Sequence, residues 1–184
     1  MSLPTIAIVG RPNVGKSSYL NAAIGRRISI VEATPGVTRD RVAVEIDCGD
    51  RTAILVDTGG IGVVDEVKLD DDIEGQIDIA LNLADCLIFL VDAKVGITPL
   101  DQRVARLLRK LNKPIVFCAN KIDHPGKNHM ATEFLRLGLG EPLILSTKEE
   151  IGVQEALEQA FAKIEDYSGW GDDGIDPDIP RIAF

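Results

Sequence analysis

Short apolar runs alternate along the chain with segments whose apolar residues recur at helical spacing. A continuous run rich in β-branched residues indicates a buried strand, and alternation of such strands with helices is typical of an α/β fold with a mostly parallel sheet. We therefore predict an α/β domain whose six-stranded sheet carries helices on both faces. We expect strands at 5–9, 42–47, 52–57, 86–92, 114–119 and 142–145, and helices at 16–24, 72–83, 99–111, 127–137 and 153–165.

The connection between the first predicted strand and helix is the segment Gly10–Ser17, which reads GRPNVGKS. It fits the phosphate-binding pattern G-x-x-x-x-G-K-[ST], and the strand and helix around it supply the context that this pattern requires. Its glycines allow successive backbone N–H groups to point at phosphate oxygens, where the helix start adds partial positive charge. Lys16 would reach the β- and γ-phosphates, and Ser17 would offer its hydroxyl to Mg²⁺. The alternative is an ordinary glycine turn. The predicted phosphate-binding residues are Gly10, Asn13, Val14, Gly15, Lys16, Ser17 and Ser18.

Two connections, 25–41 and 58–71, are long, rich in Gly, Asp and Thr, and without hydrophobic periodicity. Long connections inside a compact domain are usually functional or disordered. In the first, a hydroxyl could complete the Mg²⁺ shell only when a γ-phosphate is present, which would order the loop in one nucleotide state. Thr38 is the candidate and Thr34 the second choice, and the alternative is a polar turn around Pro35.

The second long connection follows an apolar strand that ends in Asp57. P-loop proteins hold their metal-side carboxylate at this place, so Asp57 is predicted to bind Mg²⁺ through water. Gly60 would offer its N–H to the γ-phosphate, since a small residue allows close approach. The alternative is that Asp57 caps a turn. By contrast, the stretch Lys94–Gln102, with a turn and a Pro near a helix start, is interpreted as structural.

A further polar cluster, Asn120-Lys121-Ile122-Asp123, follows the fifth predicted strand. A carboxylate accepts two hydrogen bonds from the N1–H and N2–H₂ groups of guanine, and adenine offers no such pair on that edge. A site built on a buried polar pair strongly rejects an analogue that lacks it. Asp123 is therefore the predicted specificity residue, with Asn120 holding the loops together and the Lys121 stem covering the base. Backbone N–H groups at Ser146 and Thr147 could bond guanine O6.

Composition changes this picture little. The chain has 184 residues, 45% apolar and 27% charged, with a net charge of −9. We expect a cytoplasmic protein, since neither a membrane-length apolar run nor a signal peptide is present, and no direct nucleic-acid binding, since no basic footprint is visible. The three cysteines, Cys48, Cys86 and Cys118, are widely spaced and are interpreted as reduced, buried thiols.

These motifs, in this order, are similar to those of Ras-like, translation-factor-type P-loop GTPases. Over residues 3 to about 165, the chain resembles the first GTPase domain of the bacterial Der (EngA) family. The segments that carry the resemblance are GRPNVGKSS, ATPGVTRDR, DTGGIG, VDAKVGITPLDQ, NKID and LRLGLGEPL. The resemblance implies Mg²⁺-dependent GTP hydrolysis, a second GTPase domain and a KH-like domain in the same chain, and assembly of the large ribosomal subunit. One departure is Ser146-Thr147, where the family usually has Ser-Ala. Because binding there is mainly through backbone groups, we expect little effect.

The C-terminal part suggests a domain boundary. We expect the GTPase domain to cover 1–166 and an acidic, Gly/Asp-rich linker to cover 167–178. Residues 179–184 echo residues 3–8, which suggests the start of a second GTPase domain. The alternative is an unrelated tail.

Ile61 stands where Ras-type enzymes carry the glutamine that orients the attacking water. The chain therefore resembles the subclass with a hydrophobic residue there, in which several members use a monovalent cation that a phosphate-loop Asn helps to hold. We predict a K⁺ site at Asn13, and slow intrinsic turnover. The competing catalysts are Arg39 and Arg41, and Asn13 could instead only stabilise the loop turn.

Two functions stay open: a GTP-hydrolysing switch, and a guanine-nucleotide binding module with little hydrolysis of its own. An ATP-dependent kinase-like enzyme is disfavoured by Asp123 and by the lack of a second substrate lid.

Overall fold

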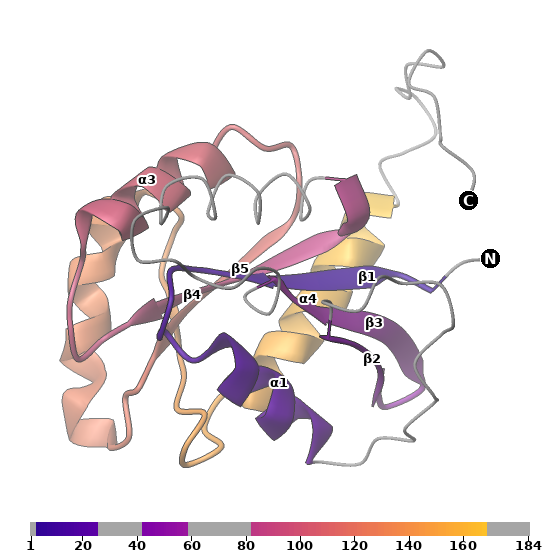
Figure 1. Cartoon of the computed structure of the whole chain (residues 1–184), viewed down its shortest axis with the longest axis horizontal. Coiled ribbons are helices and arrows are strands. Elements are labelled where there is room, and N and C mark those ends of the chain that lie inside the picture. The colour runs from indigo at the N-terminus through magenta and orange to yellow at the C-terminus, as the bar shows by residue number, and fades with distance from the viewer. Residues whose placement is uncertain (1–2, 26–41, 59–81, 169–184) are drawn as a thin grey trace.

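The described part of the chain, residues 3–25, 42–58 and 82–168 of a computed structural model, is built on one six-stranded sheet (Figure 1). The strand order is β2-β3-β1-β4-β5-β6, and neighbouring strands are parallel except β2 and β3. The predicted α/β architecture is therefore confirmed. The strands are β1 Thr5–Val9, β2 Val42–Cys48, β3 Arg51–Asp57, β4 Cys86–Asp92, β5 Ile115–Asn120 and β6 Leu143–Ile144.

The centre of the sheet is apolar because it is covered on both faces. All seven residues of β4 are buried, as are four of the five in β1. Parallel strands buried on both faces typically show such continuous apolar runs. The antiparallel pair β2–β3 lies at one edge and is joined by a two-residue turn, in which Gly49 has a φ of +69°.

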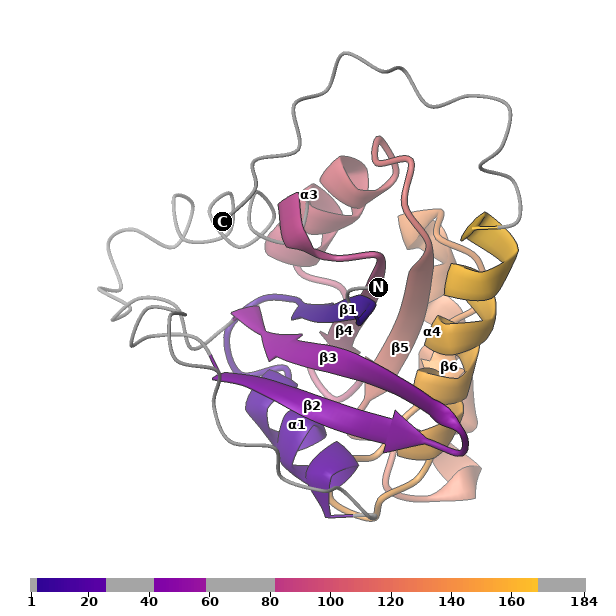
Figure 2. The same cartoon turned by 90° about the vertical axis from the view of Figure 1, so that its right-hand side faces the viewer.

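Helices cover the two faces of the sheet in pairs (Figure 2). On one face, α1 (Lys16–Ile24) and α4 (Val153–Ser168) share a hydrophobic cluster with the sheet. On the other, α3 (Pro99–Leu108) and the 3₁₀-helical segment η2 (Pro125–Leu137) share a second cluster. No helix within the described ranges has the length and apolar character needed to cross a bilayer.

Some predicted boundaries were wrong. The predicted helix 99–111 ends at Leu108, where the last turn tightens into bonds from Lys110 N–H to Leu107 O and from Leu111 N–H to Leu108 O. The helix predicted at 153–165 continues to residue 168. The strand predicted at 142–145 is shorter and covers only 143–144. Of the helix predicted at 72–83, only 82–83 lies within the described residues.

The segment predicted as an α-helix at 127–137 is a 3₁₀ helix that starts at Pro125. Its buried residues Ala131, Phe134 and Leu137 are spaced by three, which places them on one side of a helix with three residues per turn. Gly138, at a φ of +68°, ends the segment. An apolar spacing of three residues is compatible with both helix types, so periodicity did not distinguish them.

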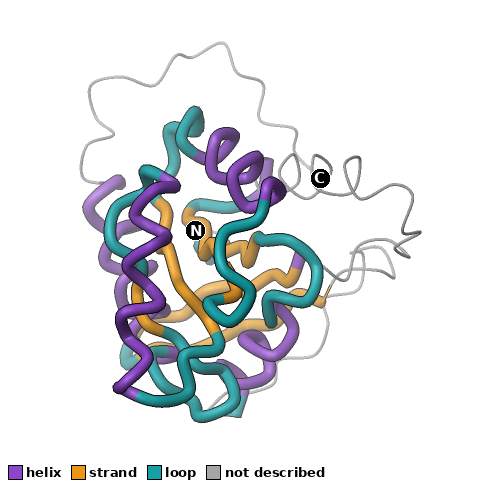
Figure 3. The backbone as a smooth tube through the Cα atoms, turned by 90° about the vertical axis from the view of Figure 1, so that its left-hand side faces the viewer, coloured by secondary structure: helices purple, strands orange, loops and turns teal. Residues whose placement is uncertain are grey.

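The carboxyl ends of β1, β3, β4 and β5 point to the same side of the sheet because these strands are parallel. Figure 3 views the side where the chain leaves β1 and enters α1, and loops following the strands gather there. This edge is where parallel α/β sheets bind ligands.

Candidate nucleotide-binding site

The phosphate loop is held tightly between the sheet and a neighbouring loop. Gly10 and Gly15 have φ values of +151° and +102°, in the region that favours glycine. A Cβ at Gly10 would collide with the Leu90 carbonyl, and one at Gly15 with the Asn120 amide nitrogen. Asn13, at a φ of +65°, also takes the left-handed conformation that the turn requires.

The start of α1 lacks a side-chain cap. Its N-cap is Gly15, which has no side chain to bond to the first backbone N–H groups. Helix N–H groups without an internal partner bind anions readily, and the helix dipole adds to this effect. The loop and the helix start together form a cradle suited to phosphate.

Lys16 lies inside this cradle and is only 6% exposed. Its ammonium donates to the carbonyl oxygens of Gly10 and Arg11, at 2.7 and 2.9 Å. Burial lowers the pKa of Lys16, the neighbouring Asp57 carboxylate raises it, and Arg11 lowers it further. A phosphate bound here would supply the negative charge that a buried ammonium favours.

Ser17 and Asp57 form the second polar pair. The Ser17 hydroxyl donates to Asp57 Oδ2 at 2.6 Å, and Asp57, at the end of β3, is 1% exposed. Hydroxyl and carboxylate oxygens are hard ligands that suit Mg²⁺, which keeps several waters and commonly shares phosphate oxygens with a nucleotide. The described residues hold no cluster of three or more His, Cys, Asp or Glu side chains that would form an all-protein metal cage. The pair therefore fits a nucleotide-bound Mg²⁺.

Asn120 links three loops from the end of β5. Its fully buried amide donates to Val14 O at 2.8 Å, and its Oδ1 accepts the N–H groups of Lys121 and Thr147 at 2.8 and 3.1 Å. The phosphate loop, the loop after β5 and the loop after β6 are thus tied to one side chain. This is the linking position that the sequence predicted for Asn120.

Lys121 follows in the left-handed region, with a φ of +71°. Its ammonium donates to Asn13 O at 2.8 Å and to Asp92 Oδ2 at 2.6 Å. The head of this side chain is therefore anchored between the phosphate loop and the end of β4. An anchored head fixes the apolar stem that was predicted to cover a base.

Asp123 accepts one bond on each carboxylate oxygen. Ser146 Oγ donates to Oδ1 at 2.8 Å, and Lys94 Nζ donates to Oδ2 at 2.6 Å. The Lys94 hydrogen bond, followed by that of Ser146, lowers the pKa of Asp123, while burial opposes them. The carboxylate is therefore ionised at neutral pH and remains 13% exposed.

The structure brings most of the predicted site residues to one edge of the sheet. The phosphate loop, Asp57, the 120–123 loop and Ser146-Thr147 all lie there. Six residues that the sequence analysis weighed for roles in catalysis or metal binding lie outside the described residues: Thr34, Thr38, Arg39, Arg41, Gly60 and Ile61.

Sequence reasoning missed Asp92 and Lys94, which join this network from the end of β4. Lys94 was assigned to a purely structural stretch. The available signal was positional: β4 ends between β1 and β5, whose following residues carry the two strongest motifs. Polar residues at that strand end therefore lie beside both motifs.

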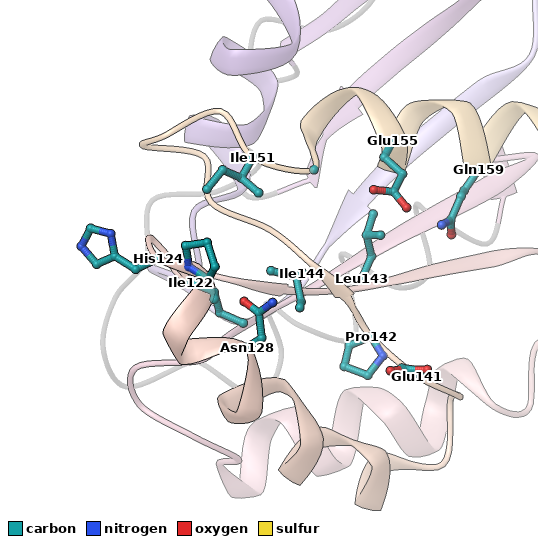
Figure 4. A pocket seen from close by; sticks show the side chains of 12 residues that line it. Ile122, His124, Asn128, Glu141, Pro142, Leu143, Ile144, Ile151, Glu155 and Gln159 are labelled. Atoms are coloured by element: carbon teal, nitrogen blue, oxygen red, sulfur yellow. The ribbon is translucent and has the colours of Figure 1, made fainter.

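A separate pocket of about 520 Å³ opens where η2 and α4 approach the edge strand β6 (Figure 4). Leu143 and Ile144 line it from β6, and Glu155 and Gln159 reach it from α4. None of the predicted nucleotide-binding residues lines it. The candidate site is therefore the polar edge at the strand ends and not this pocket.

Comparison with known proteins agrees with this geometry. The family model described as 50S ribosome-binding GTPase matches residues 5–121. GTPase Der of Ruminiclostridium cellulolyticum is 46% identical over 162 residues, covering 88% of this chain and 37% of that protein. GTPase Der of Acetivibrio thermocellus is 43% identical over 184 residues, covering 100% of this chain and 41% of that protein. The chain thus spans about two fifths of the length of these relatives.

Solved structures of Era are similar in fold and, more weakly, in sequence. Era of Aquifex aeolicus bound to GDP·AlF₄⁻ superposes with a TM-score of 0.66 at 28% identity, over 89% of this chain and 57% of that one. Era in complex with MgGDPNP and a segment of 16S ribosomal RNA gives a TM-score of 0.63 at 27% identity, with the same coverage.

Proposed function

This chain belongs to the family of 50S ribosome-binding GTPases, and on that premise we propose that it binds GTP with Mg²⁺ and hydrolyses it to GDP and phosphate. The observation that carries the proposal is the meeting of three groups at one sheet edge: the phosphate loop, the Ser17–Asp57 pair and the carboxylate of Asp123. Each group suits a different part of the nucleotide.

The nucleotide phosphates would lie in the cradle of the phosphate loop. Lys16 would exchange its bonds to two carbonyl oxygens for bonds to the β- and γ-phosphate oxygens. Its charge would then stabilise the negative charge that grows on these oxygens during bond cleavage. The guanine edge would pair with Asp123, with Asn120 holding the surrounding loops in place.

The Ser17 hydroxyl and the Asp57 carboxylate are the described residues that would hold Mg²⁺. When bound, the ion would supply positive charge at the β- and γ-phosphate oxygens. Thr38 and the N–H of Gly60, from the two long connections, are proposed to complete the site only in the GTP-bound state.

Ile61 leaves the attacking water without a side chain to orient it, since a hydrocarbon chain neither accepts nor donates a hydrogen bond. We propose that backbone groups position the water and that K⁺, held through Asn13, stabilises charge beside the phosphates. Asn13 is an exposed residue of the phosphate loop, which supports access of such an ion to this position.

The test is GTP turnover by this chain in KCl against NaCl at equal ionic strength, with Asn13→Ala as the variant. Faster hydrolysis in KCl that is lost in Asn13→Ala supports the cation mechanism. Equal rates in the two salts would exclude it and direct attention to Arg39 and Arg41. A salt-matched titration with labelled GDP shows whether the variant still binds nucleotide.

The second candidate is a guanine-nucleotide binding module with little hydrolysis of its own, which the presence of Ile61 favours. Tight GDP and GTP binding with negligible turnover in both salts would support it. Absence of nucleotide binding would overturn both candidates.

For the whole protein, we propose a cytoplasmic role in assembly of the large ribosomal subunit, on the basis of its similarity to proteins called GTPase Der. Contacts with the ribosome would be made through the full-length protein, including a second GTPase domain and a KH-like domain. This chain carries a net charge of −9, which disfavours direct binding to RNA by itself. Gel-shift titration with ribosomal RNA would test this proposal: we expect binding by the full-length protein and none by this chain alone.

A further inference from the structure

Hydrogen bonds in the turn after β4 hold the backbone of Lys94 in place. Asp92 is 3% exposed, and its Oδ1 accepts the Lys94 N–H at 2.9 Å. The Asp92 carbonyl accepts the N–H groups of Val95 and Gly96 at 3.2 and 3.1 Å, and Gly96 has a φ of +80°. A buried carboxylate and a tight turn therefore fix the point from which the Lys94 side chain extends.

The Asp92 carboxylate contacts two lysines in different ways: the backbone of Lys94 and the side chain of Lys121. Asp92 Oδ2 accepts the ammonium of Lys121 at 2.6 Å, which directs that side chain toward the phosphate loop. Lys94 extends instead across to the next strand end and donates to Asp123 Oδ2 at 2.6 Å. Two ion pairs, Asp92–Lys121 and Lys94–Asp123, thus join the ends of β4 and β5.

The Lys94 bond leaves the carboxylate able to receive a base. An ionised carboxylate has about four lone-pair positions, two on each oxygen. Lys94 occupies one on Oδ2 and Ser146 occupies one on Oδ1, so one position on each oxygen remains. The N1–H and N2–H₂ donors of guanine lie side by side and need one acceptor each.

We propose that Lys94 is a positioning residue for guanine recognition, which holds the Asp123 carboxylate in the orientation that presents one free lone pair per oxygen to the base. This inference rests on the proposed function, because it takes Asp123 as the group that binds the base. Lys94 acts through Asp123, to which its ammonium donates.

The other polar groups near Asp123 do not replace this contact. Lys148 contributes only a weaker long-range attraction, and its ammonium pairs with Glu149 at 2.9 Å. Ser146 fixes Oδ1 alone. The Lys94 hydrogen bond is also the largest cause of the lowered pKa of Asp123, which agrees with a direct contact between the two groups. The Lys94 side chain is 48% exposed, so solvent screens its electrostatic attraction to Asp123, while the direct hydrogen bond between the two groups remains.

The experiment measures binding of fluorescent GDP and GTP to the chain with Lys94→Met and Lys94→Arg. Lys94→Met removes the ammonium but keeps an unbranched stem of similar length. We expect about tenfold weaker binding of both nucleotides, as for loss of one charge-assisted hydrogen bond in a partly exposed place. Lys94→Arg should restore most of the affinity. Lys110→Met, an exposed lysine just after α3, is the matched control and should leave affinity unchanged.

A double-mutant cycle separates positioning from a general structural or electrostatic role. Xanthine carries an oxygen where guanine carries N2–H₂, so Asp123→Asn should bind XDP in place of GDP, its amide N–H₂ facing that oxygen. An amide N–H₂ cannot accept a hydrogen bond from the Lys94 ammonium, so Lys94 cannot position that group. Lys94→Met should therefore weaken GDP binding in the parent chain and change XDP binding by less than about twofold in the Asp123→Asn background.

Equal weakening of GDP and XDP binding would overturn the positioning role in favour of a general one. Tighter GDP binding by Lys94→Met would also overturn the positioning role, because it would show that the ammonium competes with the base for Asp123. If Asp123→Asn still prefers GDP over XDP, the base assignment itself is wrong and both proposals fall. Matching thermal unfolding curves for the single variants exclude loss of folding as the cause.

Discussion

Asn120 shows how much of the site depends on one buried amide. Its donor and acceptor are both in use, toward Val14, Lys121 and Thr147, and the side chain is fully buried. Removing such a group leaves buried backbone groups unsatisfied, which costs more than the net strength of a single hydrogen bond.

Asn120→Ala should therefore lower the free energy of unfolding by about 2–3 kcal/mol, as measured by urea denaturation. It should also abolish detectable GDP binding, because three loops lose their common link. Asn21→Ala, at an exposed position on α1, is the control and should change stability by less than about 0.5 kcal/mol. An Asn120→Ala chain as stable as the parent would contradict the linking role.

The cysteines behave as the sequence predicted, as free and buried thiols. Burial raises the pKa of Cys86 to about 12 and that of Cys118 higher still. The thiolate is the reactive form, so a raised pKa delays reaction to higher pH.

Alkylation of Cys86 by iodoacetamide at pH 8 should be about a thousandfold slower in the folded chain than in urea, since a shift of three pKa units lowers the thiolate fraction by that factor. In the folded chain the rate should stay low through pH 8–9, the range in which it rises in urea. Peptide mapping after timed quenching measures each cysteine. Rapid modification of folded Cys86 at pH 8 would contradict its burial.

At the scale of elements, α3 begins with a complete capping box. The Thr98 hydroxyl accepts the Asp101 N–H at 3.2 Å, and Asp101 Oδ2 accepts the Thr98 N–H at 3.0 Å. Pro99 occupies the first helical position. Arg11 of the phosphate loop donates to the same Asp101 oxygen at 3.4 Å, so the helix start and the nucleotide site share this carboxylate.

Thr98→Ala should destabilise the chain by about 1 kcal/mol, since it removes the helix cap. Thr98→Ser keeps the hydroxyl and should recover most of that loss. Thermal unfolding of the three chains side by side measures the effect. Equal stability of the Ala and Ser variants would show that the cap contributes nothing.

The helices α1 and α4 are joined through Tyr19. This side chain is fully buried, and its hydroxyl donates to Val153 O at 3.2 Å, at the start of α4. Burial raises the pKa of Tyr19 well above its ordinary value, so the phenol stays protonated and able to donate. Tyr19→Phe should lower the free energy of unfolding by about 1 kcal/mol in urea, with binding of GDP retained. A loss above about 3 kcal/mol would show that the ring itself had been displaced.

At the scale of the whole molecule, the site is assembled at the ends of five strands, β1, β3, β4, β5 and β6, each anchored in a sheet that is covered on both faces. A ligand that joins these strand ends binds only the folded state and so stabilises it by mass action. GDP with Mg²⁺ at 100 times its Kd should raise the free energy of unfolding by about 2.7 kcal/mol.

This linkage predicts a higher Tm with GDP and Mg²⁺, a smaller rise after EDTA is added, and no rise with ADP and Mg²⁺. Ser17→Ala should remove most of the Mg²⁺-dependent part, since it deletes one of the two paired oxygens. The same rise with ADP would contradict guanine recognition by Asp123.

The sequence by itself determined the α/β class, the bounds of β1, β4 and α1, and the motifs that meet at the strand ends. These are local properties: apolar runs specify buried strands, glycines permit the phosphate loop, and parallel strands bring their following residues to one edge. Only the tertiary structure decided the rest. It set the antiparallel pairing of β2, the 3₁₀ form of η2 and the contact of Lys94 with Asp123. That contact joins residues 29 positions apart through a flexible side chain, and its existence depends on how two strand ends pack, which no local pattern specifies.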